Sequence, residues 1–157
     1  MIPDNSGVSV AVSNHQRRLR VDTHALARIA RCALELVHDH DSHLGIVLVN
    51  DAAIAKLNAQ YHATSGPTDV LSFDYGKGHG ELIISVECAI RHARRFRATP
   101  TRELILYVVH GILHLHGYDD QTPNDQRRMR AAERRLMSRL GHFYEFKSLI
   151  SQQKAKR

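Results

Sequence analysis

Two histidines one helical turn apart, inside a nearly all-apolar segment, constrain this chain more than any other feature. The segment from Leu104 to Leu115 contains His110 and His114. Residues four apart leave a helix on the same face, so both imidazoles can bind one divalent metal, as in His-x-x-x-His zinc sites. Burying two imidazoles without partners would cost about 2 kcal/mol or more each. A metal site therefore explains the pair better than an ordinary core helix does.

The residues after this pair predict the end of the helix and a third ligand. Gly117 accepts the left-handed conformation that a helix C-terminus requires. The chain can then turn back and bring Asp119 or Asp120 to the two histidines. Three protein ligands leave a coordination position for water, which is typical of catalytic metal sites. His116 points about 200° away from His114 round the helix, so we do not expect it to be a ligand.

The motif His110-Gly-x-Leu-His114-Leu-x-Gly-Tyr-Asp resembles the signature of the YbeY family of bacterial endoribonucleases. Further stretches agree with the family in the same order, and the resemblance runs from about Leu44 to Gly141. They are Leu57-Asn58-x-x-Tyr61 with Pro67–Phe73, then Gly80–Ser85, then Met129, Glu133 and Leu140-Gly141. The resemblance implies a metal-dependent hydrolase, an endoribonuclease specific for single strands. It further implies a role in maturation of the 16S ribosomal RNA 3′ end and in ribosome quality control.

Three departures from the family pattern bear on the site. Asp120 stands where the family usually has a third His, so we expect His110, His114 and Asp120 to bind the metal. Zinc is the expected ion, although a carboxylate ligand also suits manganese or iron. His62 replaces an Arg that works near the scissile phosphate in the family. We expect it to be catalytic, binding phosphate or moving a proton, and the alternative is an exposed polar residue at a helix end. Glu81 replaces an Asp and keeps its charge.

Other interpretations of the motif are open at this point. Some zinc proteases take their third ligand from a Glu on a later helix, and Glu133 is such a candidate, ranked below Asp120. A zinc metalloprotease would carry a general-base Glu after the first His, where this chain has Gly111. A non-catalytic ribosome-binding module would hold a structural metal, usually with four ligands that include Cys.

The charge of the chain favours a polyanionic partner. The formal net charge is +6 and the sequence pI is near 9.7. Arg91, Arg94 and Arg95 are the predicted RNA-binding residues, because guanidinium groups match phosphate oxygens. A second arginine set covers a later helix, and a solvated surface is its default interpretation unless it borders the metal; it comprises Arg127, Arg128, Arg130, Arg134, Arg135 and Arg139. Single-stranded or ribosomal RNA is the expected partner, with ribosomal proteins or a ribosome-associated GTPase as further candidates.

Length and hydropathy predict one domain over residues 1–150 and a polar basic tail over 151–157. We expect no membrane span and no secretory signal, because long apolar runs are lacking. Cys32 and Cys88 lie far apart and outside any Cys-x-x-Cys spacing, so we expect reduced thiols and a cytoplasmic protein.

The expected fold is α+β, a small mixed sheet with helices packed over it and the metal site on a buried helix. The apolar patterns predict strands at Val8–Val12, Leu44–Val49, Asp69–Phe73 and Glu81–Val86, the last two forming an antiparallel pair across a loop at Tyr75–Gly80. Helices are expected after Asp22, Asn50, Thr99 and Thr122 and over Glu87–Phe96, and a turn is expected at Thr64–Pro67. We expect His38–His43, dense in ligand types, to be a solvated loop.

Overall fold

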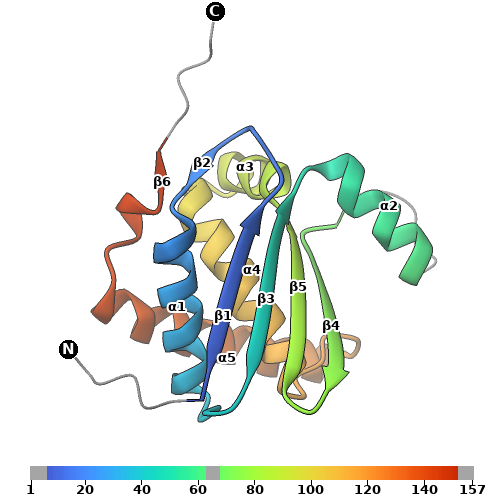
Figure 1. Ribbon diagram of the computed structural model, residues 1–157, viewed down its shortest axis with the longest axis vertical. Helices are drawn as coiled ribbons and strands as arrows, with labels where there is room; N and C mark the ends of the chain where they lie inside the picture. Colours follow the sequence, from blue (N-terminus) through green and yellow to red (C-terminus); the bar gives the residue numbers. More distant parts are fainter. Residues whose placement is uncertain (1–6, 63–67, 152–157) are drawn as a thin grey trace, which may run out of the picture.

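The computed structural model describes residues 7–62 and 68–151, except the side chains at positions 62, 148, 150 and 151. It confirms the α+β class (Figure 1). The strands are β1 (Ser9–Asn14), β2 (Arg20–Val21), β3 (His43–Val49), β4 (Val70–Gly76), β5 (His79–Ser85) and β6 (Ile150–Ser151). The helices are α1 (Thr23–Leu36), α2 (Asp51–His62), α3 (Val86–Arg95), α4 (Pro100–Leu115), α5 (Pro123–Phe143) and the 3₁₀ turn η1 (Phe146–Ser148).

The main sheet is mixed, with strand order β1-β3-β5-β4. β1, β3 and β5 are parallel, whereas β4 pairs antiparallel with β5, as the sequence predicts. Leu82 and Ile84 of β5 point into the main core beside α4, while Ile83 points to the other face. There it packs in a smaller apolar cluster with Ile54 of α2. Helices therefore cover the sheet on both faces, and α4 lies at the centre of the larger layer.

The turn between β4 and β5 is tighter than expected. A loop over Tyr75–Gly80 was predicted from its three glycines, but both strands continue almost to a turn at Lys77. Gly76, Lys77 and Gly78 take φ values of 79°, 54° and 77°. Glycine adopts such left-handed values without strain, so two glycines around one residue close the hairpin in fewer residues.

The long central helix α4 begins and ends where the sequence predicts. The Thr99 hydroxyl accepts the backbone N–H of Arg102, and Pro100 occupies the first turn. At the other end Gly117, at φ 91°, lies in a Schellman arrangement, in which Tyr118 donates its backbone N–H to the carbonyl of Leu113. This abrupt end turns the following chain back toward the helix.

Gly111 brings α4 close to the sheet. A Cβ atom at this position would lie 2.6 Å from a methyl carbon of Leu82 on β5. The absent side chain lets the helix backbone approach the strand, and Ile112 beside it is fully buried. The face that carries His110 and His114 is thereby held at a fixed height over the sheet.

The two ends of the chain differ from expectation in one respect. β2 and β6 form a small antiparallel pair, in which Arg20 opposes Ser151, so the first residue of the predicted tail belongs to a strand. Residues 152–157 and the predicted turn at Thr64–Pro67 lie outside the described residues. Within residues 7–62 and 68–151, no helix combines the length and hydrophobicity that crossing a membrane requires.

Candidate metal site

His110 and His114 lie on one face of α4, near its C-terminal end. Their ring centroids are 4.6 Å apart and the rings are nearly perpendicular. Both side chains are partly buried, with 21% and 28% of their surfaces exposed. Their helical spacing and the packing of α4 on the sheet hold the two rings side by side at the edge of the core.

Asp120 completes a group of three potential ligands. Its Oδ2 atom lies 3.5 Å from Nε2 of His110 and 3.4 Å from Nε2 of His114. Two ligand atoms about 2.1 Å from one tetrahedral zinc ion lie about 3.4 Å from each other. The three ligand atoms all lie within 4.8 Å of one another, and nitrogen and carboxylate oxygen both suit zinc. The residues therefore fit a single divalent ion.

Glu133 of α5 binds the other nitrogen of His110. Its Oε1 atom lies 2.6 Å from Nδ1, so the carboxylate accepts the Nδ1 proton and leaves Nε2 directed toward Asp120. Burial of the His110 ring opposes protonation, but the Glu133 carboxylate outweighs it and raises the pKa of His110 above its ordinary value. Asp69 and Asp120 act on that pKa in the same direction. Carboxylates that hold metal-binding histidines in this way fix the ring and its tautomer.

The three candidate ligands are accessible from solvent. A pocket of about 270 Å³ is lined by His110, Asp120 and Glu133, together with Gln126, Met129 and Arg130 of α5. The Asp120 side chain is 44% exposed, so the site opens to the surface on that side. Its neighbour Asp119 accepts the backbone N–H of Asp120, a local contact that orders the turn carrying the third ligand. An open position beside three protein ligands can admit water or a substrate oxygen.

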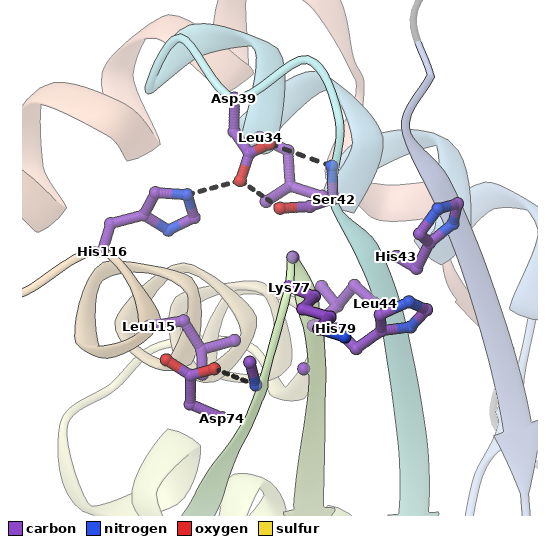
Figure 2. A pocket seen from close by; sticks show the side chains of 13 residues that line it. Leu34, Asp39, Ser42, His43, Leu44, Asp74, Lys77, His79, Leu115 and His116 are labelled. Carbon is purple, nitrogen blue, oxygen red and sulfur yellow. Dashed lines mark hydrogen bonds and ion pairs between the residues drawn. The ribbon is translucent and has the colours of Figure 1, made fainter.

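His116 occupies a different setting, as its direction on the helix predicts. Its Nε2 atom lies 2.6 Å from Oδ2 of Asp39 (Figure 2). Its Nδ1 atom lies 2.8 Å from the carbonyl of Ile112. Both ring nitrogens are thus at hydrogen-bond distance from protein oxygens.

The loop at His38–His43 is exposed at four of its six positions, as expected, whereas Asp39 and Ser42 are partly buried. The Asp39 side chain is 15% exposed and binds both His116 and the Ser42 hydroxyl, next to a pocket of about 260 Å³ (Figure 2). Burial opposes ionisation of Asp39, but the hydrogen bonds from Ser42 and His116 outweigh it and lower the pKa of this carboxyl. The loop therefore joins the end of α4 to the end of α1, a contact that the loop's sequence does not reveal.

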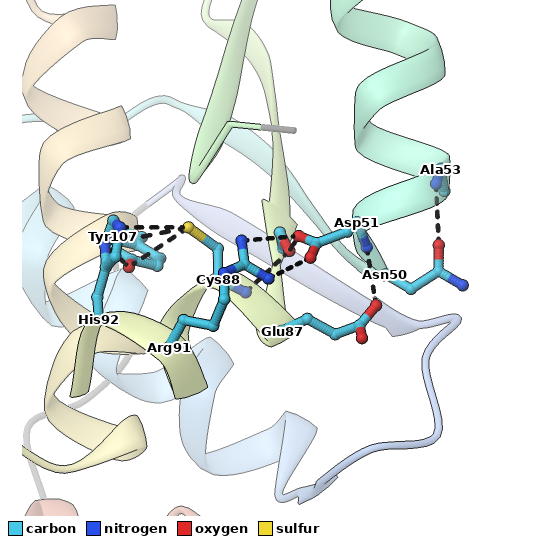
Figure 3. A network of polar contacts seen from close by, with 9 residues as sticks. Asn50, Asp51, Ala53, Glu87, Cys88, Arg91, His92 and Tyr107 are labelled. Atoms are coloured by element: carbon cyan, nitrogen blue, oxygen red, sulfur yellow. Dashed lines mark hydrogen bonds and ion pairs between the residues drawn. The ribbon is translucent and has the colours of Figure 1, made fainter. Parts of the chain in front are cut away.

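Arg91, one of the three predicted RNA-binding residues, contributes to a polar network. It forms an ion pair with Asp51 at the start of α2, and Asp51 also accepts the Ser85 hydroxyl at 2.8 Å (Figure 3). Glu87 accepts the backbone N–H of Asp51 at 3.0 Å, so α3 holds the first turn of α2. Next to this network His92 lies 2.7 Å from the Tyr107 hydroxyl (Figure 3).

Arg94 and Arg95, the two other predicted RNA-binding residues, lie away from the three candidate ligands. Arg94 and Arg95 are exposed on α3, and Arg95 lies over the ring of Phe96. α3 packs on the N-terminal half of α4, where Tyr107 reaches His92, whereas His110 and His114 follow further along α4. His62 is the last residue of α2, and its side chain lies outside the described residues.

Two residues, Glu133 and Arg130, have a different place at the site from the one predicted from the sequence. Glu133 was weighed as a ligand, but it contacts the far nitrogen of His110. Arg130 was assigned to a solvated surface, but it lines the pocket of the candidate ligands. The sequence does contain a signal for both contacts. Glu133 lies at the edge of the apolar stripe of α5, and this position turns Glu133 and Arg130 toward α4.

The fold and the site define an α+β protein with a solvent-facing group of two histidines and one carboxylate that can hold a metal ion. The family model described as endoribonuclease YbeY matches residues 11–141, and the chain belongs to this family. An endoribonuclease YbeY of Pelotomaculum thermopropionicum is 34% identical over 146 residues, covering 83% of this chain and 96% of the relative. One of Geobacter metallireducens is 33% identical over 142 residues, covering 83% and 95%.

A solved structure agrees with the fold. The solution structure of a Thermotoga maritima protein superposes with a TM-score of 0.61 and 24% sequence identity, covering 96% of this chain and 99% of that one. The family makes the chain a nuclease of the hydrolase class, involved in ribosomal RNA processing, with RNA as its substrate. This confirms the functional prediction and does not support the protease or the non-catalytic module.

Proposed function

We propose that the chain cleaves single-stranded RNA with one divalent ion held by His110, His114 and Asp120. The observation that carries this proposal is the 3.4–3.5 Å separation of Asp120 from both histidines, beside an open pocket. The bound ion would polarise the scissile phosphate or lower the pKa of a bound water. Zinc fits the donor set, and the carboxylate also suits manganese.

In this proposal Glu133, Asp120 and His62 have separate roles. Glu133 holds the Nδ1 proton of His110, which keeps the Nε2 lone pair free and correctly aimed. Asp120, as a charged ligand, moderates the Lewis acidity of the ion relative to a third histidine. His62 is proposed to contact the scissile phosphate or to move a proton there, in the place of the Arg usual in the family.

We place this activity in maturation of the 16S ribosomal RNA 3′ end and in ribosome quality control. Ribosomal proteins or a ribosome-associated GTPase are the proposed partners, and the cytoplasm is the proposed location. The free thiols of Cys32 and Cys88 support a reducing compartment. Residues 1–150 are proposed to form one domain, with the basic segment 151–157 as its tail.

The test pairs metal analysis with RNA cleavage. The purified protein is stripped with a chelator, measured by elemental analysis and assayed on a labelled single-stranded RNA and its duplex, before and after adding zinc or manganese. We expect cleavage of the single strand to disappear with the metal and to return with it. Unchanged cleavage by fully stripped protein would contradict the proposal. The His116→Ala variant is the matched control, and it should keep both metal and activity.

A further inference from the structure

The arginines of α5 divide into two groups. At 100° per residue, Arg127, Arg130 and Arg134 lie within about 60° of one another, and Arg130, the nearest of them to Glu133, lies about 60° from it. We call these three residues the metal-side stripe. Roughly 120° further round the helix the outer stripe follows, which comprises Arg128, Arg135 and Arg139. Each stripe consists of three arginines on the same helix. The stripes therefore differ in the residues that surround them and not in their charge.

The metal-side stripe borders the candidate metal site. Arg130 is exposed and lines the same pocket as His110, Asp120 and Glu133. Glu133, three residues away, would be its natural ion-pair partner on the helix. That carboxylate instead binds His110 at 2.6 Å, and Arg130 forms no ion pair with any residue in the described ranges 7–62 and 68–151. The guanidinium of Arg130 is therefore available at the mouth of the pocket.

The outer stripe faces other parts of the molecule. Arg128 lines a separate pocket with Asp119 and Asp125, whose carboxylates reduce its local field. Arg139 lies close enough to Cys32 of α1 to act on its thiol electrostatically. Arg128 and Arg139 thus have neighbours of their own, and no arginine of the outer stripe lines the pocket of His110.

Because an RNA substrate is negatively charged, the charges around the metal site affect how it binds. Asp120, Glu133 and Asp69 all act on His110 as negative charges. Together they outweigh the two positive charges of a bound divalent ion, so the site as a whole would still repel an approaching phosphate chain. A guanidinium at the pocket mouth offsets this repulsion and can bind phosphate oxygens through two parallel hydrogen bonds. Arg130 and Arg134 lie about 6 Å apart along the helix axis, so they can contact different phosphates of one strand.

We infer that the metal-side stripe is the phosphate-binding track that leads single-stranded RNA to the metal, with Arg130 nearest the scissile phosphate. This inference rests on the proposed function and names the surface that the substrate follows. It favours α5 over the α3 arginines predicted from the sequence. Arg91 is paired with Asp51, and α3 lies at the opposite end of α4 from α5 (Figure 1).

Three double variants of equal charge change test the inference. They are Arg130→Gln with Arg134→Gln, Arg135→Gln with Arg139→Gln, and Arg94→Gln with Arg95→Gln. Binding of a fluorescent 20-nucleotide oligouridylate is measured by anisotropy between 50 and 300 mM salt, with chelator present so that no strand is cut. Thermal melting checks that each variant is folded, and cleavage is measured separately on metal-loaded protein.

Only the metal-side pair is expected to weaken binding, and its plot of log affinity against log salt should be shallower by about 1.4, from two lost phosphate contacts of about 0.7 each. An equal effect of the outer pair would show a diffuse field and overturn the inference. A larger effect of the α3 pair would show that the RNA binds along α3 and not along α5. If none of the three double variants changed RNA binding, the metal-side stripe would not be an RNA-binding surface, and the inference would be overturned. If the metal-loaded wild-type protein bound RNA but did not cleave it, the proposed function would be refuted. The inference about the metal-side stripe would still stand.

Discussion

His114 and His116 are two residues apart at the end of α4, yet their surroundings are opposite. His116 has oxygens 2.6 and 2.8 Å from its two nitrogens, which is hydrogen-bond length. By contrast, Oδ2 of Asp120 lies 3.4 Å from Nε2 of His114 and 3.5 Å from Nε2 of His110. The longer separation leaves a space that an ion can fill, whereas the shorter ones leave none.

The difference follows from the direction in which each ring leaves the helix. His114 shares a face with His110, and its Nε2 atom faces Asp120, which lines the open pocket beside α5. His116 lies where the helix ends and points to the loop after α1, where Asp39 meets it. An identical side chain is therefore a candidate ligand in one place and a structural link in the other.

Removing His114 should have the largest effect on metal binding. His114→Ala deletes a candidate ligand, and we expect the affinity for zinc to fall by more than about 100-fold. Elemental analysis of the purified variant checks this. His116→Ala is the matched control, with one ion per chain retained but a lower melting temperature. Full occupancy in His114→Ala would remove the contrast between the two histidines.

The two neighbouring aspartates should differ as the two histidines do. Asp120→Ala removes a candidate ligand and should lower metal affinity sharply, whereas Asp119→Ala removes a turn contact and should lower it much less. Asp120→His should restore binding, because imidazole nitrogen also suits zinc. Competition with a chromogenic chelator measures all three affinities. Equal losses at both aspartates would show that Asp120 acts only through the turn.

Glu133 should act on metal affinity through His110. Glu133→Ala leaves the Nδ1 proton without an acceptor, and we expect affinity to fall about 10-fold to 100-fold. Glu133→Gln keeps an acceptor oxygen without the charge, so its loss should be smaller. The visible spectrum of the cobalt-substituted variants distinguishes the two roles, because a lost direct ligand changes coordination geometry. A clear change of geometry in Glu133→Gln would make Glu133 a ligand.

Breaking the Asp39–His116 contact should change stability and spare the metal. Asp39→Asn should lower the free energy of unfolding by about 1.5–3 kcal/mol, the usual contribution of a hydrogen bond to a charged group. The pKa of Asp39 is lowered on folding, so its contribution is complete above the ordinary value of 3.8 and is lost as pH falls through the lowered value. Denaturant titrations at pH 7 and pH 3 should show a smaller difference at pH 3. A difference that grows toward acid would contradict the assignment.

The smallest effect is expected at Arg91. Its ion pair with Asp51 is half-exposed, and such pairs contribute about 0.2–1 kcal/mol. Arg91→Gln should therefore destabilise the protein slightly in denaturant titration, while Arg94→Gln, on the same helix, should not. An equal response of both variants would show that the network between α2 and α3 adds nothing to stability.

The sequence predicts the parts of this site that depend on local rules. The spacing of His110 and His114, the cap at Thr99 and the stop at Gly117 are decided within one or two helical turns, and the structure agrees with them. The Glu133 contact depends on how α5 crosses α4, and no local pattern specifies that crossing. Asp39 and His116 are 77 residues apart, so their contact follows from the packing of α1 beside α4.

The most direct test of the account is a crystal structure of the protein grown with zinc, with anomalous data collected at the zinc edge. We expect one peak bonded to Nε2 of His110, to His114 and to a carboxylate oxygen of Asp120, with water or substrate oxygen completing the coordination and Glu133 still on Nδ1 of His110. A peak bonded to Glu133 or His116, with Asp120 turned to solvent, would contradict it.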